Sequence, residues 1–407
     1  MINRVLADFA WSFLAALLWV SCAGAQAQTS PPTPAVITRA PNSEPCPSGF
    51  SSPGGAGNPS VCYQATATCP NANTPSLGLV YSYVMPTTPP MNNGVIVFFS
   101  GAGGQLETLQ AVNAQFALDY YKAGFGIVEV AWDSAWEQTS DSLGILTAAC
   151  RPAGFLSYIY RNYLLPIRQA RNGNPTAGMC AQGISAGSGA AAYSLVWYQD
   201  SAQPPNQLSA DLDNVELESG PVFSDIDLGC DASRGSQIVS ICQTGQFGCS
   251  TGTTPWTAAD VLYVYGNLVS IRQWTNDPTC GNAGTTARSN QQWTEMSIVN
   301  GSAVNGTLGN FTYPNVGMAG WLCASSTSNC TPSTGCPNNS AAEGQEFYNQ
   351  FTSKAQVSGY VLTGITGCSG PEGVADGMDP DNSPPNQTGA EAIEAHMKKQ
   401  CTHPTAH

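Results

Sequence analysis

The strongest chemical signal in the chain is a serine set between two glycines, Gly183-Ile184-Ser185-Ala186-Gly187. A strand-like segment precedes this motif and small residues follow it, which is typical of a sharp strand-to-helix turn that exposes a serine hydroxyl. The chain is rich in Gly and Ser, so about 0.4 chance matches to the short pattern are expected and its context gives it weight. We predict that Ser185 is a nucleophile and that the N–H of Ala186 faces a developing oxyanion.

A second glycine-rich segment, Ser100-Gly101-Ala102-Gly103-Gly104, directly follows the apolar run Val95–Phe99. An oxyanion hole needs backbone N–H groups that a substrate can approach closely, and small residues permit that approach. Ala102 and Gly103 are therefore the predicted donors. Taken alone, the segment is also compatible with a tight turn that has no chemical role.

Alternating strand-like and helix-like segments must position these residues. The runs that predict strands are 79–84, 95–99, 126–132, 214–218, 316–322 and 358–363, and those that predict helices are 106–122, 142–164, 188–198, 341–352 and 389–399. Such alternation favours an α/β fold with a mostly parallel, doubly wound sheet covered on both faces. We assign it to residues 76–401, with a Cys- and Trp-containing insertion near 230–310.

With the glycine-rich loop and the serine motif in this order, residues 76–401 resemble the α/β-hydrolase family. That family includes esterases, lipases, polyester depolymerases and peptidases. The resemblance implies a mostly parallel eight-stranded sheet and a nucleophile at Ser185. It also implies an acid and a histidine that follow Ser185 in chain order.

The histidine position of the family is not matched, although a serine hydroxyl needs a positioned base. The loop after the last predicted strand, residues 365–388, holds Glu372 and no histidine. His396 is the candidate base, and its alternative is a surface role near a helix C-terminus. Glu372 is an unusual substitute base if burial raises its pKa, and its alternative is a turn residue. His403 and His407 are expected in a terminal tail.

The acid position is also unmatched, because no carboxylate directly follows the predicted strand 316–322. Some family members place the acid one strand earlier. Asp225 and Asp227 follow the strand 214–218 here, and Asp225 is the candidate acid. The alternative is that both are solvated loop carboxylates.

The N-terminus has the layout of a secretory signal peptide. Arg4 precedes an apolar run, Phe9–Val20, and small residues lead to Ala27. The run is shorter than the ~20 residues of a spanning helix. We therefore expect residues 1–27 to be removed, the protein to be secreted or periplasmic, and no membrane association to remain. Residues 28–75, rich in Pro, Ser and Gly, are predicted to form an irregular lead-in, and 402–407 a tail.

Cysteine usage agrees with export. Removing Cys22 with the leader leaves 14 of the 15 cysteines, an even number that allows up to seven disulfides. No C-x-x-C pair occurs, so we expect no metal and no cofactor. The local pairings considered are Cys62 with Cys69, Cys242 with Cys249, and a group of Cys323, Cys330 and Cys336. A Cys368–Cys401 bridge would fold the last helix, with His396, toward the active-site face.

The net charge of the chain limits the classes of partner and substrate that it can bind. The chain has 13 Lys+Arg and 27 Asp+Glu, for a net charge of −14, and only 10% of its residues are charged. This excludes a basic nucleic-acid binder and disfavours acidic substrates. We predict a secreted serine hydrolase that acts on a neutral carboxylic ester or a polyester-like substrate. The alternative is a catalytically silent protein of the same fold that binds a ligand. The two differ in whether a base lies within hydrogen-bond reach of Ser185.

Overall fold

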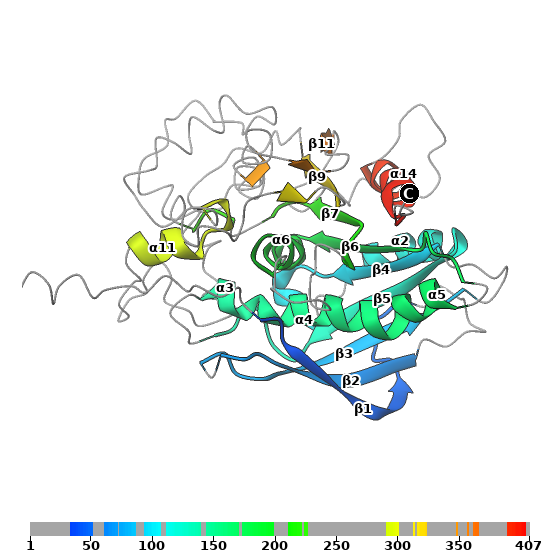
Figure 1. Ribbon diagram of the computed structural model, residues 1–407, viewed down its shortest axis with the longest axis horizontal. Coiled ribbons are helices and arrows are strands. Elements are labelled where there is room, and N and C mark those ends of the chain that lie inside the picture. The colour runs from blue at the N-terminus through cyan, green and yellow to red at the C-terminus, as the bar shows by residue number, and fades with distance from the viewer. Residues whose placement is uncertain are drawn as a thin grey trace, which may run out of the picture.

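A computed structural model gives the architecture (Figure 1). The structure describes residues 33–51, 61–71, 73–86, 93–106, 111–139, 144–170, 173–198, 211–221, 224–226, 290–300, 312–313, 316–323, 347–348, 356–357, 361–365 and 389–403.

The described residues form one nine-stranded sheet with the order β1-β2-β3-β5-β4-β6-β7-β9-β11. Its strands are β1 (Val36–Pro45), β2 (Val61–Thr68), β3 (Leu77–Val84), β4 (Gly94–Phe99), β5 (Phe125–Trp132), β6 (Gly178–Ile184), β7 (Asn214–Glu218), β9 (Gly317–Cys323) and β11 (Val361–Ile365). From β1 to β5 neighbouring strands are antiparallel, and from β5 to β11 they are parallel. The prediction of an α/β fold with a mostly parallel sheet is confirmed. A separate short pair joins β8 (Thr312–Tyr313) to β10 (Gln356–Val357).

Helices lie on both faces of the sheet. They are α2 (Ala111–Lys122), α3 (Ile145–Ala148), α4 (Cys150–Ile159), the π-helix η3 (Tyr160–Leu164), α5 (Leu165–Gln169), α6 (Ala186–Tyr198), α11 (Asn290–Met296) and α14 (Gly389–Gln400), with short 3-10 turns η1 (Ala102–Gly104) and η6 (Ile298–Asn300). Helices α4 and α6 contact each other on one face, and α2 and α14 contact each other on the other. No helix of the described ranges is long and apolar enough to span a membrane.

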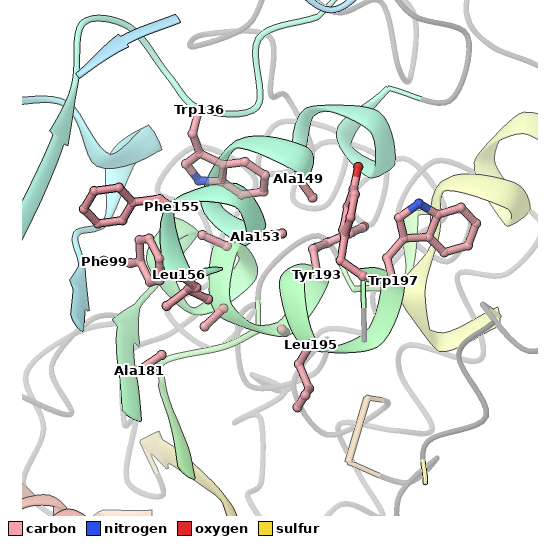
Figure 2. Close-up of a cluster of buried hydrophobic side chains, with 14 of the residues drawn as sticks. Phe99, Trp136, Ala149, Ala153, Phe155, Leu156, Ala181, Tyr193, Leu195 and Trp197 are labelled. Carbon is pink, nitrogen blue, oxygen red and sulfur yellow. The ribbon is translucent and has the colours of Figure 1, made fainter. Parts of the chain in front are cut away.

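The apolar side chains of β4 point to both faces of the sheet and contribute to two cores. Val95, Val97 and Phe99 join the core beneath α4 and α6, while Ile96 and Phe98 join the core beneath α2 and α14. Side chains alternate across a strand, so a strand covered by helices on both faces must be apolar throughout. Figure 2 shows the first of these cores, with Phe99 gathered among side chains from α4 and α6.

Helix α6 is buried along its whole length, since all 13 of its residues are shielded from solvent. Small residues at its start let it approach the sheet closely, and its larger aromatic residues Tyr193 and Trp197 extend the core of Figure 2. The helix predicted at 142–164, with an interruption near Pro152, is divided close to that position. The division falls at Ala149, between α3 and α4, and Pro152 lies in the first turn of α4, where its missing N–H is not needed.

The lead-in prediction differs from the structure. Residues 28–75 contain β1 and β2, which extend the sheet at its antiparallel edge. β1 is largely exposed, so it lacks the apolar alternation that would have predicted a strand. β2 does alternate, with Cys62, Ala65 and Ala67 buried.

Among the described residues, one disulfide joins the neighbouring β1 and β2 segments and two join elements that are far apart in the sequence. The bridges are Cys46–Cys62, Cys69–Cys150 and Cys180–Cys401. The predicted Cys62–Cys69 loop and the predicted Cys368–Cys401 bridge are therefore wrong. The Cys242–Cys249 pairing and the positions 330 and 336 lie outside the described residues, as do most of the predicted helix 341–352 and most of the insertion before α11.

The start of the predicted tail is held against the body of the protein. Thr402 pairs with Ala177 in an isolated bridge, and the N–H of His403 donates to the carbonyl of Thr176 at 2.9 Å. The Cys180–Cys401 bridge fixes the same segment to β6. The prediction that His403 belongs to a loose tail is wrong, while His407 lies outside the described residues.

Candidate active site at the β6–α6 turn

Ser185 occupies the turn that joins β6 to α6. Its φ is +51°, a left-handed conformation that a non-glycine residue rarely adopts. The turn is held by its own backbone, because the N–H of Ser185 donates to the carbonyl of Glu218 at 3.0 Å and the N–H of Ser188 donates to the carbonyl of Ser185 at 2.9 Å. Strain of this kind is concentrated at functional sites, where the surrounding structure enforces it.

The two glycines of the motif are required by close backbone packing. A Cβ at Gly183 would overlap the carbonyl of Gly187, and a Cβ at Gly187 would overlap the carbonyl of Phe99 at the end of β4. The two glycines of the predicted sharp turn therefore allow α6 to start directly against the sheet.

The predicted oxyanion loop lies beside Ser185. A Cβ built at Gly101 would be 3.4 Å from the Cβ of Ser185 and 3.9 Å from its Oγ. The loop continues through η1, where Gly103 has a φ of +76° and its carbonyl accepts the N–H of Trp136 at 3.0 Å. A Cβ at Gly103 would be 2.6 Å from the Cβ of Ala135, so only glycine fits.

The start of α6 completes this arrangement. Ala186 is the first residue of the helix, so its N–H has no acceptor within α6, and the helix N-terminus favours negative charge. The structure thus brings together Ser185, Ala186 and the loop that contains Ala102 and Gly103. With the sheet order, this is the serine turn of the α/β-hydrolase fold.

His396 is not part of this group. Its Nδ1 is 2.6 Å from Glu216 Oε1, and its Nε2 is buried with no hydrogen-bond partner among the described residues. Helix α14 carries His396 onto the face of the sheet shared with α2, against the middle of β7. No hydrogen bond joins His396 to Ser185 within the described ranges, so the structure does not place it as the base.

Glu216, which the sequence reasoning did not select, is the centre of a buried polar cluster. Besides His396, it accepts hydrogen bonds from Asn214 Nδ2 at 2.7 Å and from the indole N–H of Trp321. Its side chain is fully buried. The signal was present in the sequence, because Asn214, Glu216 and Glu218 alternate along a strand that is otherwise apolar.

Glu218 ends β7 next to the serine turn. Its carboxylate accepts a hydrogen bond from Gln182 Nε2 at 2.5 Å, and burial, its largest influence, raises its pKa to about 8. The backbone carbonyl of Glu218 holds Ser185 in place. Glu218 therefore supports the turn through its backbone, while its side chain lies with Gln182 on the face away from α6.

His403 lies in a second ion cluster, at the amino ends of the central strands β6 and β7. Asp213 accepts from His403 Nδ1 at 2.7 Å, from Arg168 Nη2 at 2.6 Å and from the N–H of Met179 at 2.7 Å. These contacts fix the segment after α14 to the start of β6 and β7.

The remaining predicted residues have mixed outcomes. Asp225 follows β7 as predicted, and because the residue is only 1% exposed the solvated-loop alternative does not apply to it. Asp227 lies outside the described residues. Glu372 lies outside the described residues. Among the described residues, no group of three or more His, Cys, Asp or Glu could hold a metal ion.

Glu137 is a further residue that the sequence reasoning missed. It is 1% exposed, and neither of its carboxylate oxygens has a hydrogen-bond partner among the described residues. One of these oxygens would be 3.3 Å from a Cβ at Gly103, which places the carboxyl group directly against the oxyanion loop. Burial raises the pKa of Glu137 to about 8, while the backbone N–H of Glu137 itself and, to a smaller extent, Arg151 oppose that rise.

Comparisons with known proteins give distant likenesses only. No family model and no curated protein matches the chain. Among solved structures, the chain is similar to EstE1, a thermophilic carboxylesterase from a metagenomic library, with 12% identity over 80% of this chain and 85% of that chain and a TM-score of 0.45.

It is also similar to a hyperthermophilic esterase from the archaeon Pyrobaculum calidifontis, with 13% identity over 90% and 87% of the two chains and a TM-score of 0.42. An arylesterase structure has 13% identity over 92% and 87% of the two chains, and a TM-score of 0.42. The assignment of the fold rests on the sheet and the serine turn described above.

Proposed function

We propose that the protein is a serine hydrolase that cleaves neutral carboxylic esters, including polyester-like ones, outside the cytoplasm. The observation that carries this proposal is Ser185 at a φ of +51°, on the turn between β6 and α6 and beside Gly101. A strained serine between a strand end and a helix start, next to a glycine-rich loop, is an arrangement that supports acyl transfer. The esterases among the solved structures named above agree with this chemistry.

In the proposed reaction, Ser185 Oγ attacks the carbonyl carbon of the ester while its proton passes to a base. The N–H groups of Ala186 and of Ala102 or Gly103 stabilise the oxyanion. The C–O bond to the alcohol then breaks, and the alcohol leaves with the proton from the base. Water then attacks the acyl-enzyme and gives a proton to the same base, which returns it to Ser185 Oγ as the C–O bond to the serine breaks and the acid leaves.

We propose Glu372 as the base. It belongs to the segment between β11 and α14, and the resemblance to α/β-hydrolases implies that this segment carries the base. His396, the other candidate, is engaged by Glu216. Asp225, which follows β7 and is buried, is the proposed supporting acid.

The test is hydrolysis of p-nitrophenyl acetate and butyrate by the purified, oxidised protein and by Ser185→Ala. We expect Ser185→Ala to lose at least about 10³-fold in kcat/KM, as removal of a catalytic serine does. Ser194→Ala is the matched control, since Ser194 is a buried serine of α6 whose hydroxyl donates to the carbonyl of Ala190 at 2.7 Å. It should retain activity.

The base is identified by comparing two further variants. Glu372→Gln is expected to lower kcat by about 10²-fold or more, whereas His396→Gln should keep kcat and lose stability. The reverse pattern would make His396 the base. A folded wild-type protein with no activity on any neutral ester would replace the proposal by the catalytically silent alternative.

A further inference from the structure

The carboxyl group of Glu137 has an unusual position beneath the oxyanion loop. Glu137 lies in the turn after β5, and two contacts join this turn to the loop: the N–H of Trp136 donates to the carbonyl of Gly103, and Ala135 lies against the Cα of Gly103. Neither oxygen of Glu137 has a hydrogen-bond partner among the described residues, although the side chain is 1% exposed. A buried, ionised carboxylate without partners is strongly unfavourable.

Arg151 is the charged group that faces Glu137. It projects from α4 and is fully buried. Its Nη1 donates to the carbonyls of Trp136 and Gln138, both at 2.6 Å, and its Nη2 donates to the carbonyl of Pro75 at 2.7 Å. Because Arg151 binds carbonyl oxygens rather than a carboxylate, its positive charge stays uncompensated while Glu137 is protonated.

The other elements around Glu137 contribute no further charge among the described residues. The oxyanion loop presents Gly103, which does not titrate. Burial lowers the pKa of Arg151, and helix α6 contributes Tyr198, which in part raises it again. The hydroxyl group of Tyr198 donates a hydrogen bond to the carbonyl of Leu146. The net charge of the Glu137–Arg151 pair therefore depends on whether Glu137 is protonated.

We propose that Glu137 is a positioning residue that supports the oxyanion loop as an uncharged carboxylic acid, so that the buried charge of Arg151 favours the oxyanion formed at Ser185. This inference rests on the proposed function. A carboxylate beside Gly103 would repel the negative charge that develops on the substrate, and in a dry site such repulsion acts over several ångströms. The protonated form removes the repulsion and leaves the attraction of Arg151.

The protonation state follows from burial. Since burial raises the pKa of Glu137 to about 8, the carboxyl group is neutral at pH 7 and ionises in mildly alkaline solution. Ionisation cancels the charge of Arg151 and places a negative charge under the loop. The rate of attack by Ser185 should then fall on the alkaline side.

The test measures the rate constant for modification of Ser185 by a fluorophosphonate probe between pH 6 and pH 9.5. We expect the wild-type rate to fall on the order of tenfold above pH 8, and Glu137→Gln to keep the rate at pH 7 within about twofold and to lose the alkaline fall. Glu129→Gln is the matched control. Glu129 is also buried with a raised pKa, but it is bonded to Ser51 and lies on β5, away from the loop. It should keep the wild-type profile.

The proposal is overturned if the wild type shows no alkaline fall, if Glu137→Gln retains the fall, or if Glu137→Gln loses activity at pH 7. If Glu137→Gln does not fold, the wild-type profile and the infrared carbonyl band of the Glu218→Gln variant decide the question, because Glu218 also keeps its proton up to about pH 8 and would otherwise contribute to the same band. That band should be present at pH 7 and disappear above pH 8. Because the band does not depend on turnover, it tests Glu137 even if Ser185 proves unreactive and the proposed function fails.

Discussion

Two buried glutamates, Glu216 and Glu137, differ sharply in their surroundings. Glu216 accepts hydrogen bonds from His396, Asn214 and Trp321, on the side of the sheet covered by α14. Glu137 accepts none from the described residues and lies against the oxyanion loop. A fully bonded buried carboxylate stabilises a fold, whereas an unbonded one is costly and is retained where chemistry needs it. The comparison separates a structural histidine site from the proposed serine site.

The largest expected effect comes from breaking the bonded site. Glu216→Ala would leave the polar groups of His396, Asn214 and Trp321 buried without their acceptor, and we expect a loss of about 3–5 kcal/mol in the free energy of unfolding. Denaturant titration measures it, with Lys399→Gln, an exposed position of α14, as the control. A loss below about 1 kcal/mol would show that the cluster does not hold α14 in place.

The second effect is the pH dependence of stability. Burial raises the folded-state pKa of both Glu137 and Glu218 to about 8, so the folded state holds their protons at pH values where the unfolded state has lost them. Their contribution is complete below the unfolded pKa of 4.5 and is lost as the pH rises through about 8. Each group lowers the free energy of unfolding by up to about 1.4 kcal/mol per pH unit between these limits.

Denaturant titrations at pH 5, 6, 7 and 8 measure this slope. Glu137→Gln and Glu218→Gln should each reduce it, because each removes one of the two carboxyl groups with a raised pKa. An equal slope in the wild type and in Glu137→Gln would mean that Glu137 is already ionised at neutral pH.

A smaller effect is expected at the reactive site. Gly103→Ala introduces a side chain at a φ of +76° and against Ala135, so it should displace the loop. We expect a loss of about 1–2 kcal/mol in the free energy of unfolding and about 10²-fold in the rate of ester hydrolysis. Normal activity in Gly103→Ala would remove this loop from the proposed oxyanion hole.

The smallest effect is expected in the segment that follows α14, Cys401–His403, which we call the C-terminal strap. His403→Ala removes the contact with Asp213, and because the His403 side chain is about one-third exposed we expect a loss of about 1 kcal/mol. Hydrogen exchange at Thr402 and nearby residues should rise while ester hydrolysis stays unchanged. A large loss of activity would instead connect the strap to the catalytic turn.

The sequence predicted the features that local physics dictates. The apolar run of β4 had to be covered on both faces, and the glycines at 183 and 187 had to lie in close backbone contact. The α/β fold, the serine turn and the adjacent loop followed from these signals. β1 was not predicted because its side chains are mostly exposed and show no apolar alternation.

Long-range pairings could not be predicted in the same way. Cys180 and Cys401 are separated by 221 positions, and nothing in their local sequence links them. The contact between His396 and Glu216 depends on where α14 lies over β7, which the sheet order and the disulfide determine together. The alternation of polar residues along β7 indicated a buried polar site, but not its partner.

The most direct test of the central claim is to identify the residue that a fluorophosphonate probe modifies. The disulfide-intact protein is treated at pH 7, digested, and its modified peptide located by mass spectrometry. We expect a single adduct on Ser185, absent from Ser185→Ala and present in His396→Gln. An adduct on another residue, or a folded protein that takes up no probe, would contradict the assignment of Ser185 as the nucleophile.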